Sequence, residues 1–347
     1  MPTKSLHLIG LIALAAAALH AQPTTGAVFW STDPNLDCSS LGESAPVAIP
    51  LAAGTGYSCY TTGTFVYLAA GGGWGTELRV AAPFSAPVGV DYSFYDTSGN
   101  PLSLDTTGSY TQSGNDLNFA LYANQPAEVE LAGATSNAAA GYNLTTVGSV
   151  YVAFYCPDAT TCGNVLPQLI YSNLPTHPWS LSVPIAWDTA VWTQWSAEGI
   201  DDGGGRRVSL VIYNEDTTAA TYTVSVYNSS GTLIGSGTTP SIPPLQDLGG
   251  GALGEGGAYA NLLANIISTP LPSGIFKVYV DGGAVYSAVE VLQFTGSSAT
   301  TLQVAYDGPS TSTSVPTLRS NAAVRRSNVS RMRAESAAKA FFKTSPQ

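Results

Sequence analysis

Charged residues are scarce in this chain: they make up 10% of its 347 residues, whereas hydrophobic residues make up 44%. A disordered chain has low hydrophobicity and high net charge, so this composition indicates a folded protein with a sizeable core. With 36 glycines and 22 prolines, the sequence is interrupted too often for a helical bundle. The length fits two domains with appendages.

Histidine and lysine are nearly absent from residues 22–318, which hold only His177 and Lys277. A serine or cysteine nucleophile needs a positioned base, usually histidine, and no GxSxG, HExxH or Walker sequence occurs. Two carboxylates can hydrolyse a glycoside. Glu128 and Glu130 lie two apart on an expected strand, so both would point to one face, which we interpret as solvated. We therefore expect a protein without enzymatic activity.

One long apolar run is present, at the N-terminus. Lys4 precedes the run Leu8–Leu19, which ends at His20 and Ala21. A short basic region, about a dozen apolar residues and a small residue are typical of a secretory signal peptide, here residues 1–21. A transmembrane helix needs about 20 apolar residues, so no span is expected. We expect a protein that is secreted or held at the cell surface or in the periplasm.

Four cysteines are present, an even number that indicates disulfides in an oxidising compartment. They allow three pairings, of which we favour the two that are local in sequence. A structural zinc site would need close pairs of thiolates or imidazoles, and no CxxC occurs. The expected bridges are Cys38–Cys59 and Cys156–Cys162.

Charge is unevenly distributed along the chain. Between Gln22 and Leu318, 22 acidic residues face four basic ones, whereas Arg319–Gln347 carry seven basic residues and one acidic residue. Nucleic-acid binding needs clustered lysine and arginine, so the acidic body excludes that class of partner. Residues 308–347 predict a Ser/Thr-rich linker and a basic tail, helical or disordered. The tail is expected to be solvated, with an anionic polymer or the acidic body as alternative partners.

An internal repeat is the clearest feature of the body. Gly71–Leu102 aligns without gaps on Gly203–Ile234, and eight positions are identical. Each copy contains two strand-like segments with period-2 alternation, followed by a turn, Asp96–Gly99 or Asn228–Gly231. Later in each copy, GSVYVAFY from Gly148 resembles GIFKVYV from Gly274, which predicts a further strand.

Short strands separated by Gly, Asn, Pro and Ser predict an all-β protein of two tandem β-sandwiches. We expect a disulfide-braced segment at residues 22–59, module one at 60–173, a Pro/Trp-rich linker at 174–191 and module two at 192–307. A short helical insert is expected in module two at Ala258–Ile267, because Leu262, Leu263 and Ile266 would share a helical face.

The pattern GGGWGTELRV…DYSFYDTSGNPLSL, with its companion GGGRRVSLVIYNED…SVYNSSGTLIG, resembles the tandem immunoglobulin-like modules of secreted, uncharacterised bacterial proteins. The resemblance covers most of residues 60–307 and rests on strands, turns and glycines. It implies immunoglobulin-like sandwiches in an exported bacterial scaffold or binding protein, and it brings no catalytic residues.

Acidic loops make calcium the one candidate cofactor. Ca²⁺ takes six to eight oxygen ligands, several of them carboxylates on loops. No DxDxDG run is present, and module one lacks the acidic pair that module two has. The candidate ligands are Asp201, Asp202, Glu215 and Asp216.

Tryptophans gather around the expected linker. Exposed tryptophan can stack on a sugar face, but a cluster between modules also fits an apolar interface, which we favour. The four candidates are Trp179, Trp187, Trp192 and Trp195. The expected function is an exported, non-enzymatic scaffold or binding protein for an extracellular polymer or protein. The alternatives are a carbohydrate-binding module and a polysaccharide-active enzyme that uses an unrecognised carboxylate pair.

Overall fold

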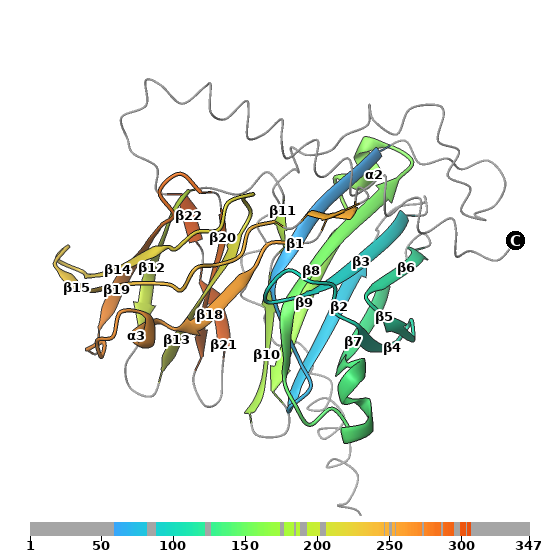
Figure 1. Cartoon of the computed structure of the whole chain (residues 1–347), viewed down its shortest axis with the longest axis horizontal. Coiled ribbons are helices and arrows are strands. Elements are labelled where there is room, and N and C mark those ends of the chain that lie inside the picture. The colour runs from blue at the N-terminus through green and yellow to red at the C-terminus, as the bar shows by residue number, and fades with distance from the viewer. Residues whose placement is uncertain are drawn as a thin grey trace, which may run out of the picture. The chain divides into compact units, whose positions relative to one another are not determined.

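The computed structural model describes residues 59–306 apart from 82–87, 122–125, 174–176, 184, 188–192, 202–205, 246, 250–251, 254, 273, 286, 295–298 and 303. Regular structure in these residues is almost entirely antiparallel β-sheet, which confirms the all-β prediction (Figure 1). The expected signal peptide, the segment containing Cys38 and the basic tail lie outside the described residues.

Two sheets form the first sandwich, with strand orders β11-β1-β8-β3-β6 and β10-β9-β2-β7-β4-β5. The strands of the first sheet are β1 (Cys59–Ala70), β3 (Val88–Asp96), β6 (Asp116–Leu121), β8 (Thr146–Cys156) and β11 (Ala186–Trp187). Those of the second are β2 (Trp74–Ala81), β4 (Leu104–Gly108), β5 (Gln112–Gly114), β7 (Pro126–Ala134), β9 (Leu166–Asn173) and β10 (His177–Val183). Two short helices, η1 (Thr135–Ala140) and α2 (Ala159–Cys162), flank β8.

The second sandwich has sheets with the orders β15-β14-β19-β12-β22 and β18-β13-β20-β21. The first sheet contains β12 (Gln194–Asp201), β14 (Thr223–Asn228), β15 (Leu233–Thr238), β19 (Ile275–Asp281) and β22 (Val304–Tyr306). The second contains β13 (Arg207–Asn214), β18 (Ala258–Leu262), β20 (Ser287–Phe294) and β21 (Ala299–Leu302). The helical turn α3 (Leu263–Ile266) and a small hairpin of β16 (Asp247–Gly249) and β17 (Ala252–Leu253) complete it.

The internal repeat corresponds to a shared topology. The aligned segments place β13 on β2 and β14 on β3, and the second similarity places β19 on β8. β2 and β13, which follow the glycines that begin each copy, lie inside one sheet of their sandwich. In the opposite sheet, β3 is the neighbour of β8 in the first sandwich and β14 is the neighbour of β19 in the second. The order β22-β12-β19-β14-β15 therefore corresponds to β11-β1-β8-β3-β6, and β21-β20-β13-β18 corresponds to β10-β9-β2-β7.

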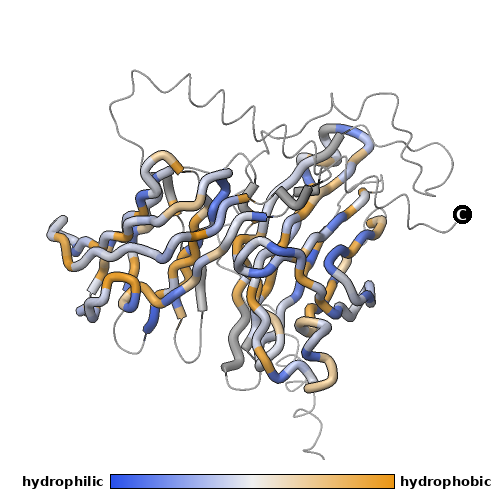
Figure 2. Tube along the Cα trace, viewed as in Figure 1, coloured by the Kyte–Doolittle hydropathy of each residue, from blue (hydrophilic) through white to orange (hydrophobic). Residues whose placement is uncertain are grey.

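Each sandwich has its own core, which period-2 alternation builds. Along β3, the residues Val88, Val90, Tyr92 and Phe94 enter the first core. Successive side chains of a strand point to opposite faces, so Asp91 lies on the face away from that core. Figure 2 shows hydrophobic and hydrophilic residues interleaved along the strands. The second core is a separate cluster.

The repeated turn has one construction in both copies. Asp96 Oδ1 accepts hydrogen bonds from the backbone N–H groups of Ser98 and Asn100, at 2.8 and 2.9 Å. Asn228 Oδ1 accepts the equivalent bonds from Ser230 and Thr232, at 3.0 and 2.8 Å. The glycine that closes each turn has a left-handed backbone, which favours the residue without a Cβ.

Two features of the expected layout, one in module two and one in the linker, differ in the structure. Ala258–Leu262 is a strand, because all five residues pair with Ser209–Tyr213 of β13; only Leu263–Ile266 is helical. Pairing with a central strand overrides the helical spacing of the leucines. The expected linker contributes β10 and β11 to the first sandwich, and Leu181 and Val183 enter the first core.

A third apolar cluster joins the two sandwiches. Val66 of β1 packs with Val211 and Tyr213 of β13 and with Ala258 and Ala288. The repeated turn of the first sandwich reaches the same region, where the Ala258 N–H donates to the Thr97 carbonyl at 3.1 Å. We call this region the inter-sandwich contact.

Candidate functional site

Polar side chains cover the outer face of the β11-β1-β8-β3-β6 sheet, opposite the first core. We name as the polar face the residues Thr62, Thr64, Asp91, Ser93, Asp116, Asn118, Ser149 and Tyr151. They come from β1, β3, β6 and β8, where they alternate with core residues such as Phe65, Tyr92, Leu117 and Val150. An outward sheet face is normally solvated, but Ser149, Thr64 and Asp91 are only 0%, 1% and 4% exposed.

Strand register brings the carboxylates of this face together. Asp91 of β3 lies directly opposite Asn118 of β6, and Ser93 lies opposite Asp116. On its other side, Asp91 is opposite Ala153 of β8, so only a methyl group stands there. The side chains of these four residues on β3 and β6 therefore lie next to one another. We call them the grid: Asp91, Ser93, Asp116 and Asn118.

Several oxygen atoms of the polar face lack a hydrogen-bond partner within the described part of the chain. They are Thr64 Oγ1, Asp91 Oδ1, Asn118 Oδ1 and Ser149 Oγ. Buried polar atoms in native proteins are almost always satisfied, so each exception calls for an explanation such as an ion or water. By contrast, Asp116 accepts a hydrogen bond from Asn115 Nδ2 at 3.0 Å.

The electrostatics of the grid keep one carboxyl neutral. Burial, together with the charge of Asp116, raises the pKa of Asp91 to about 8. Burial also raises the pKa of Asp116, although hydrogen bonds from Ser93 and Asn115 act in the opposite direction. At neutral pH the Asp91 carboxyl is therefore protonated in the folded protein.

The corresponding sheet of the second sandwich lacks this arrangement. By the repeat alignment, Thr223 takes the place of Asp91 and Ser225 that of Ser93. Thr223 is exposed, and the same outer face carries the ion pair of Lys277 with Glu198 at 3.5 Å. The polar face is therefore specific to the first sandwich.

A second buried carboxyl lies at the inter-sandwich contact. Glu290 of β20 is 6% exposed, and neither carboxyl oxygen has a hydrogen-bond partner among the described residues. Burial raises the pKa of Glu290 to about 8. Its charge would act on Tyr67 and Tyr171, whose pKa values are raised by burial and by Glu290. Its burial leaves this carboxyl almost no surface that a ligand could contact.

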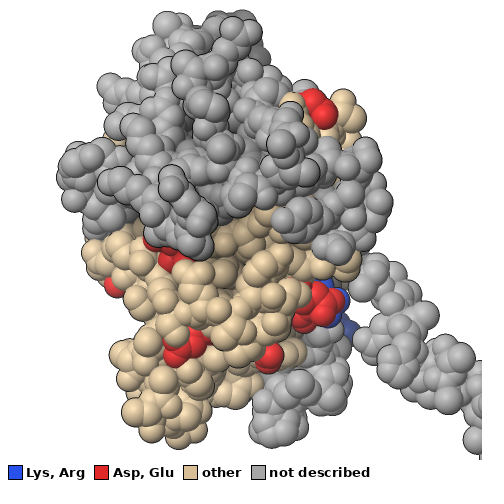
Figure 3. Space-filling model, turned by 90° about the vertical axis from the view of Figure 1, so that its right-hand side faces the viewer, with Lys and Arg blue, Asp and Glu red and all other residues tan. Residues whose placement is uncertain are grey.

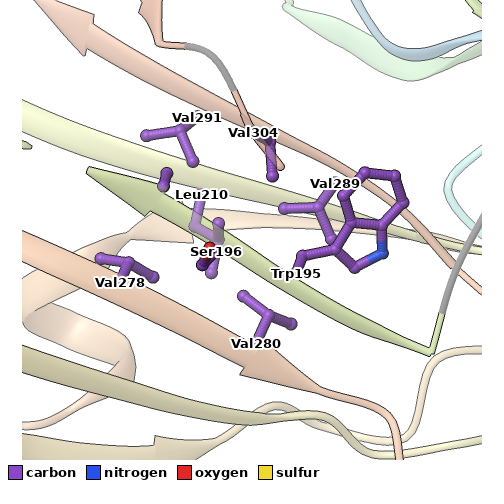
Figure 4. Close-up of a pocket in the computed structure, with 9 residues that line it drawn as sticks. Trp195, Ser196, Leu210, Val278, Val280, Val289, Val291 and Val304 are labelled. Atoms are coloured by element: carbon purple, nitrogen blue, oxygen red, sulfur yellow. The ribbon is translucent and has the colours of Figure 1, made fainter. Parts of the chain in front are cut away.

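Of the four candidate tryptophans, Trp195 is the one whose side chain the structure describes. Its ring is 8% exposed, and its indole N–H donates to the carbonyl and the hydroxyl of Ser287, at 3.1 and 3.2 Å. It borders a small apolar space in the second core, beside Val289 and Val304 (Figure 4). A buried ring is not available for stacking on a sugar. Trp179 lies in β10, Trp187 in β11, and Trp192 is outside the described residues.

The acidic loop residues do not come together in the described structure. Asp201, at the end of β12, forms an ion pair with Arg206. Glu215 and Asp216 follow β13, and the Asp216 N–H donates to Asn214 Oδ1 at 2.9 Å. Asp202 lies outside the described ranges. Within those ranges, His, Cys, Asp and Glu form no group of three that could hold a metal ion.

The cysteine and glutamate predictions can be compared with the structure directly. Cys156 and Cys162 form the expected disulfide, with 5.3 Å between their Cα atoms. Cys59 begins β1 opposite Cys156, and its expected partner Cys38 lies outside the described residues. Glu128 and Glu130 are exposed on β7, which confirms the prediction of a solvated strand face.

Sequence reasoning missed the polar face because its parts are remote in sequence. The segment Val88–Asp96 showed a strand with one apolar face, and the other face would ordinarily be solvated. The available signal was the pair of polar positions in Asp116–Leu121, but the register that sets Asn118 against Asp91 is not contained in either segment.

The surface and the comparisons give no further functional signature. Acidic groups stand at separate places on the mostly uncharged face in Figure 3. In the part of the chain that the structure covers, no helix has the length and apolarity needed to cross a membrane. No protein-family model matches the chain, and comparison with curated proteins finds no similar sequence.

Proposed function

We propose that this chain is an exported, non-enzymatic scaffold protein of two immunoglobulin-like sandwiches that presents its surface to an extracellular polymer or protein. The N-terminal apolar run and the Cys156–Cys162 disulfide support export, because disulfides persist in oxidising compartments. The inter-sandwich contact is the observation that carries the scaffold role. It combines apolar packing around Val66 with a backbone hydrogen bond from Ala258 to Thr97, which favours a fixed arrangement over free hinging.

The immunoglobulin-like assignment is supported by part of the strand order. An immunoglobulin domain pairs its strands as A-B-E-D and C-F-G. The neighbours β2-β7-β4 and β3-β8 correspond to B-E-D and C-F. The terminal strands differ, because β1 lies beside β8 and β9 lies beside β2, so the first and last strands are exchanged between sheets. The proposed fold is therefore a variant of the immunoglobulin arrangement in which the terminal strands have changed sheets.

Export is tested by expressing the full chain in a bacterium and locating it by cell fractionation. We expect the protein outside the cytoplasm, with its N-terminus after Ala21 and a faster gel mobility before reduction than after it. A variant without residues 1–21 is the control, and it should remain in the cytoplasm with reduced cysteines. Cytoplasmic retention of the full chain with residues 1–21 still attached would refute the proposal.

A polysaccharide-active enzyme is the second candidate, and it would use the Asp91–Asp116 pair, although Asp91 is only 4% exposed and Asp116 is the one of the two that is half-buried. Two carboxyls of unequal environment can divide the acid and base roles of glycoside hydrolysis. The assay is release of reducing ends from a panel of soluble polysaccharides by the purified chain. Activity that Asp91→Asn abolishes and Glu128→Gln preserves would establish the enzyme and overturn the scaffold proposal. No release from any substrate is the expected result.

A further inference from the structure

The polar face is mostly buried. Ser149, Thr64, Asp91 and Tyr151 are all less than 5% exposed, whereas Asp116 and Asn118 on the edge strand β6 are half-buried, so a large ligand could reach the face only at that edge. The face nevertheless contains acceptor oxygens without partners among the described residues. A group that satisfies them must be small.

The donor atoms of the grid are all oxygens. Asp91 and Asp116 supply carboxylates, Asn118 an amide oxygen, and Ser93 a hydroxyl. Directly opposite residues of an antiparallel pair have Cβ atoms about 4.5–5.5 Å apart, so these four side chains can converge on one point between β3 and β6. Oxygen-only ligand sets with two carboxylates are typical of hard divalent cations, calcium above all.

Charge supplies an independent argument. Two carboxylates on neighbouring strands repel one another, and a carboxyl taken out of water stays protonated unless its charge is paired or binds a metal. The grid's two carboxyls lie on adjacent strands with Asp91 Oδ1 unpartnered, and no lysine or arginine of the described residues forms an ion pair with either. A bound cation would meet both requirements.

We propose that Asp91, Asp116 and Asn118, with the hydroxyl of Ser93, bind a calcium ion on the outer face of the first sandwich. The inference rests on the proposed export, because extracellular modules bind calcium with Kd values on the order of 10⁻⁴–10⁻³ M, which suits that compartment. The site is distinct from the acidic loops of the second sandwich. Thr223 replaces Asp91 in the second copy of the repeat, so that copy has no equivalent site.

The experiment uses the mature full chain and two probes, Tb³⁺ and Ca²⁺. Tb³⁺ luminescence is sensitised by nearby tyrosine, and Tyr151 lies opposite Ser93 on β8. We expect saturable emission that Ca²⁺ displaces and K⁺ does not, and a Tm that rises with Ca²⁺. Asp91→Asn should abolish both responses while raising the Tm measured without calcium, since it removes a buried carboxyl.

Glu128→Gln is the matched control, because it removes one exposed carboxylate from β7 in the opposite sheet. It should keep the full calcium response. Asp91→Thr, which copies the second sandwich, is the alternative variant if Asp91→Asn does not fold. Absence of saturable Tb³⁺ emission in the unaltered chain, or a calcium response that survives both Asp91 substitutions, overturns the proposal. Neither result bears on export, which cell fractionation decides separately.

Discussion

Gly99 and Gly231 form a matched pair for testing the inter-sandwich contact. They hold the same position in the two copies of the repeat, with φ values of 84° and 78°, and close the same turn. A Cβ added at Gly231 would meet nothing within 4 Å, whereas one added at Gly99 would overlap the backbone carbonyl of Glu255. Both substitutions by alanine therefore impose the same backbone strain, but only Gly99→Ala also creates a steric conflict.

The magnitudes follow from these two environments. An alanine held in the left-handed region costs about 1–2 kcal/mol, which is the whole expected loss for Gly231→Ala. Gly99→Ala adds displacement of the Glu255 carbonyl and the neighbouring hydrogen bond from Ala258 to Thr97. A buried hydrogen bond left unmade costs about 1–3 kcal/mol, so the expected loss for Gly99→Ala is about 2–5 kcal/mol.

Urea unfolding followed by circular dichroism measures both variants under identical conditions. We expect Gly231→Ala to lower the midpoint modestly and Gly99→Ala to lower it further, with the transition separating into two as the sandwiches cease to unfold together. Equal losses in the two variants, with unchanged cooperativity, would refute the view that this turn fastens one sandwich to the other.

Two further outcomes are expected. The pKa of Glu290 is raised to about 8 in the folded protein, so the folded state binds more protons than the unfolded state between pH 5 and 8, and stability should fall across that range. The pKa of Asp91 is raised to about the same value, so Glu290→Gln should reduce the pH dependence of the Tm without abolishing it, and an unchanged slope would contradict the assignment. Replacing both Cys156 and Cys162 by alanine should cost about 2 kcal/mol in urea unfolding without reductant, because the bridge joins cysteines six residues apart. A double variant as stable as the unaltered chain would argue against a stabilising bridge.

The sandwiches themselves were predictable because their cores depend on local alternation. The repeat located β2 and β3 in the first copy and β13 and β14 in the second, and the similarity after Gly148 located β8. The alternation of side chains within a single segment such as Val88–Phe94 is enough to predict a strand with one buried face. The local disulfide was predictable for the same reason, since its cysteines bracket a single turn of chain.

Features that depend on pairing between remote segments were not predictable. Ala258–Leu262 has helical spacing, and only its neighbour β13 makes it a strand. The Pro-rich segment around His177 looked like a linker, since its pairing with β9 is a tertiary property. Asp91 and Asp116 required the β3–β6 register, and burial of their outward face could not be inferred from either strand.

The inter-sandwich contact is heterologous, which means that it joins two different surfaces. The turn of the first sandwich contacts the β13–β18 side of the second sandwich and not the equivalent turn of that sandwich. Repetition of a head-to-tail contact gives a ring when the rotation closes and an open array when it does not. The second sandwich carries the same turn at Asn228–Thr232, with free space around Gly231. The geometry of the contact therefore does not itself limit a row to two sandwiches.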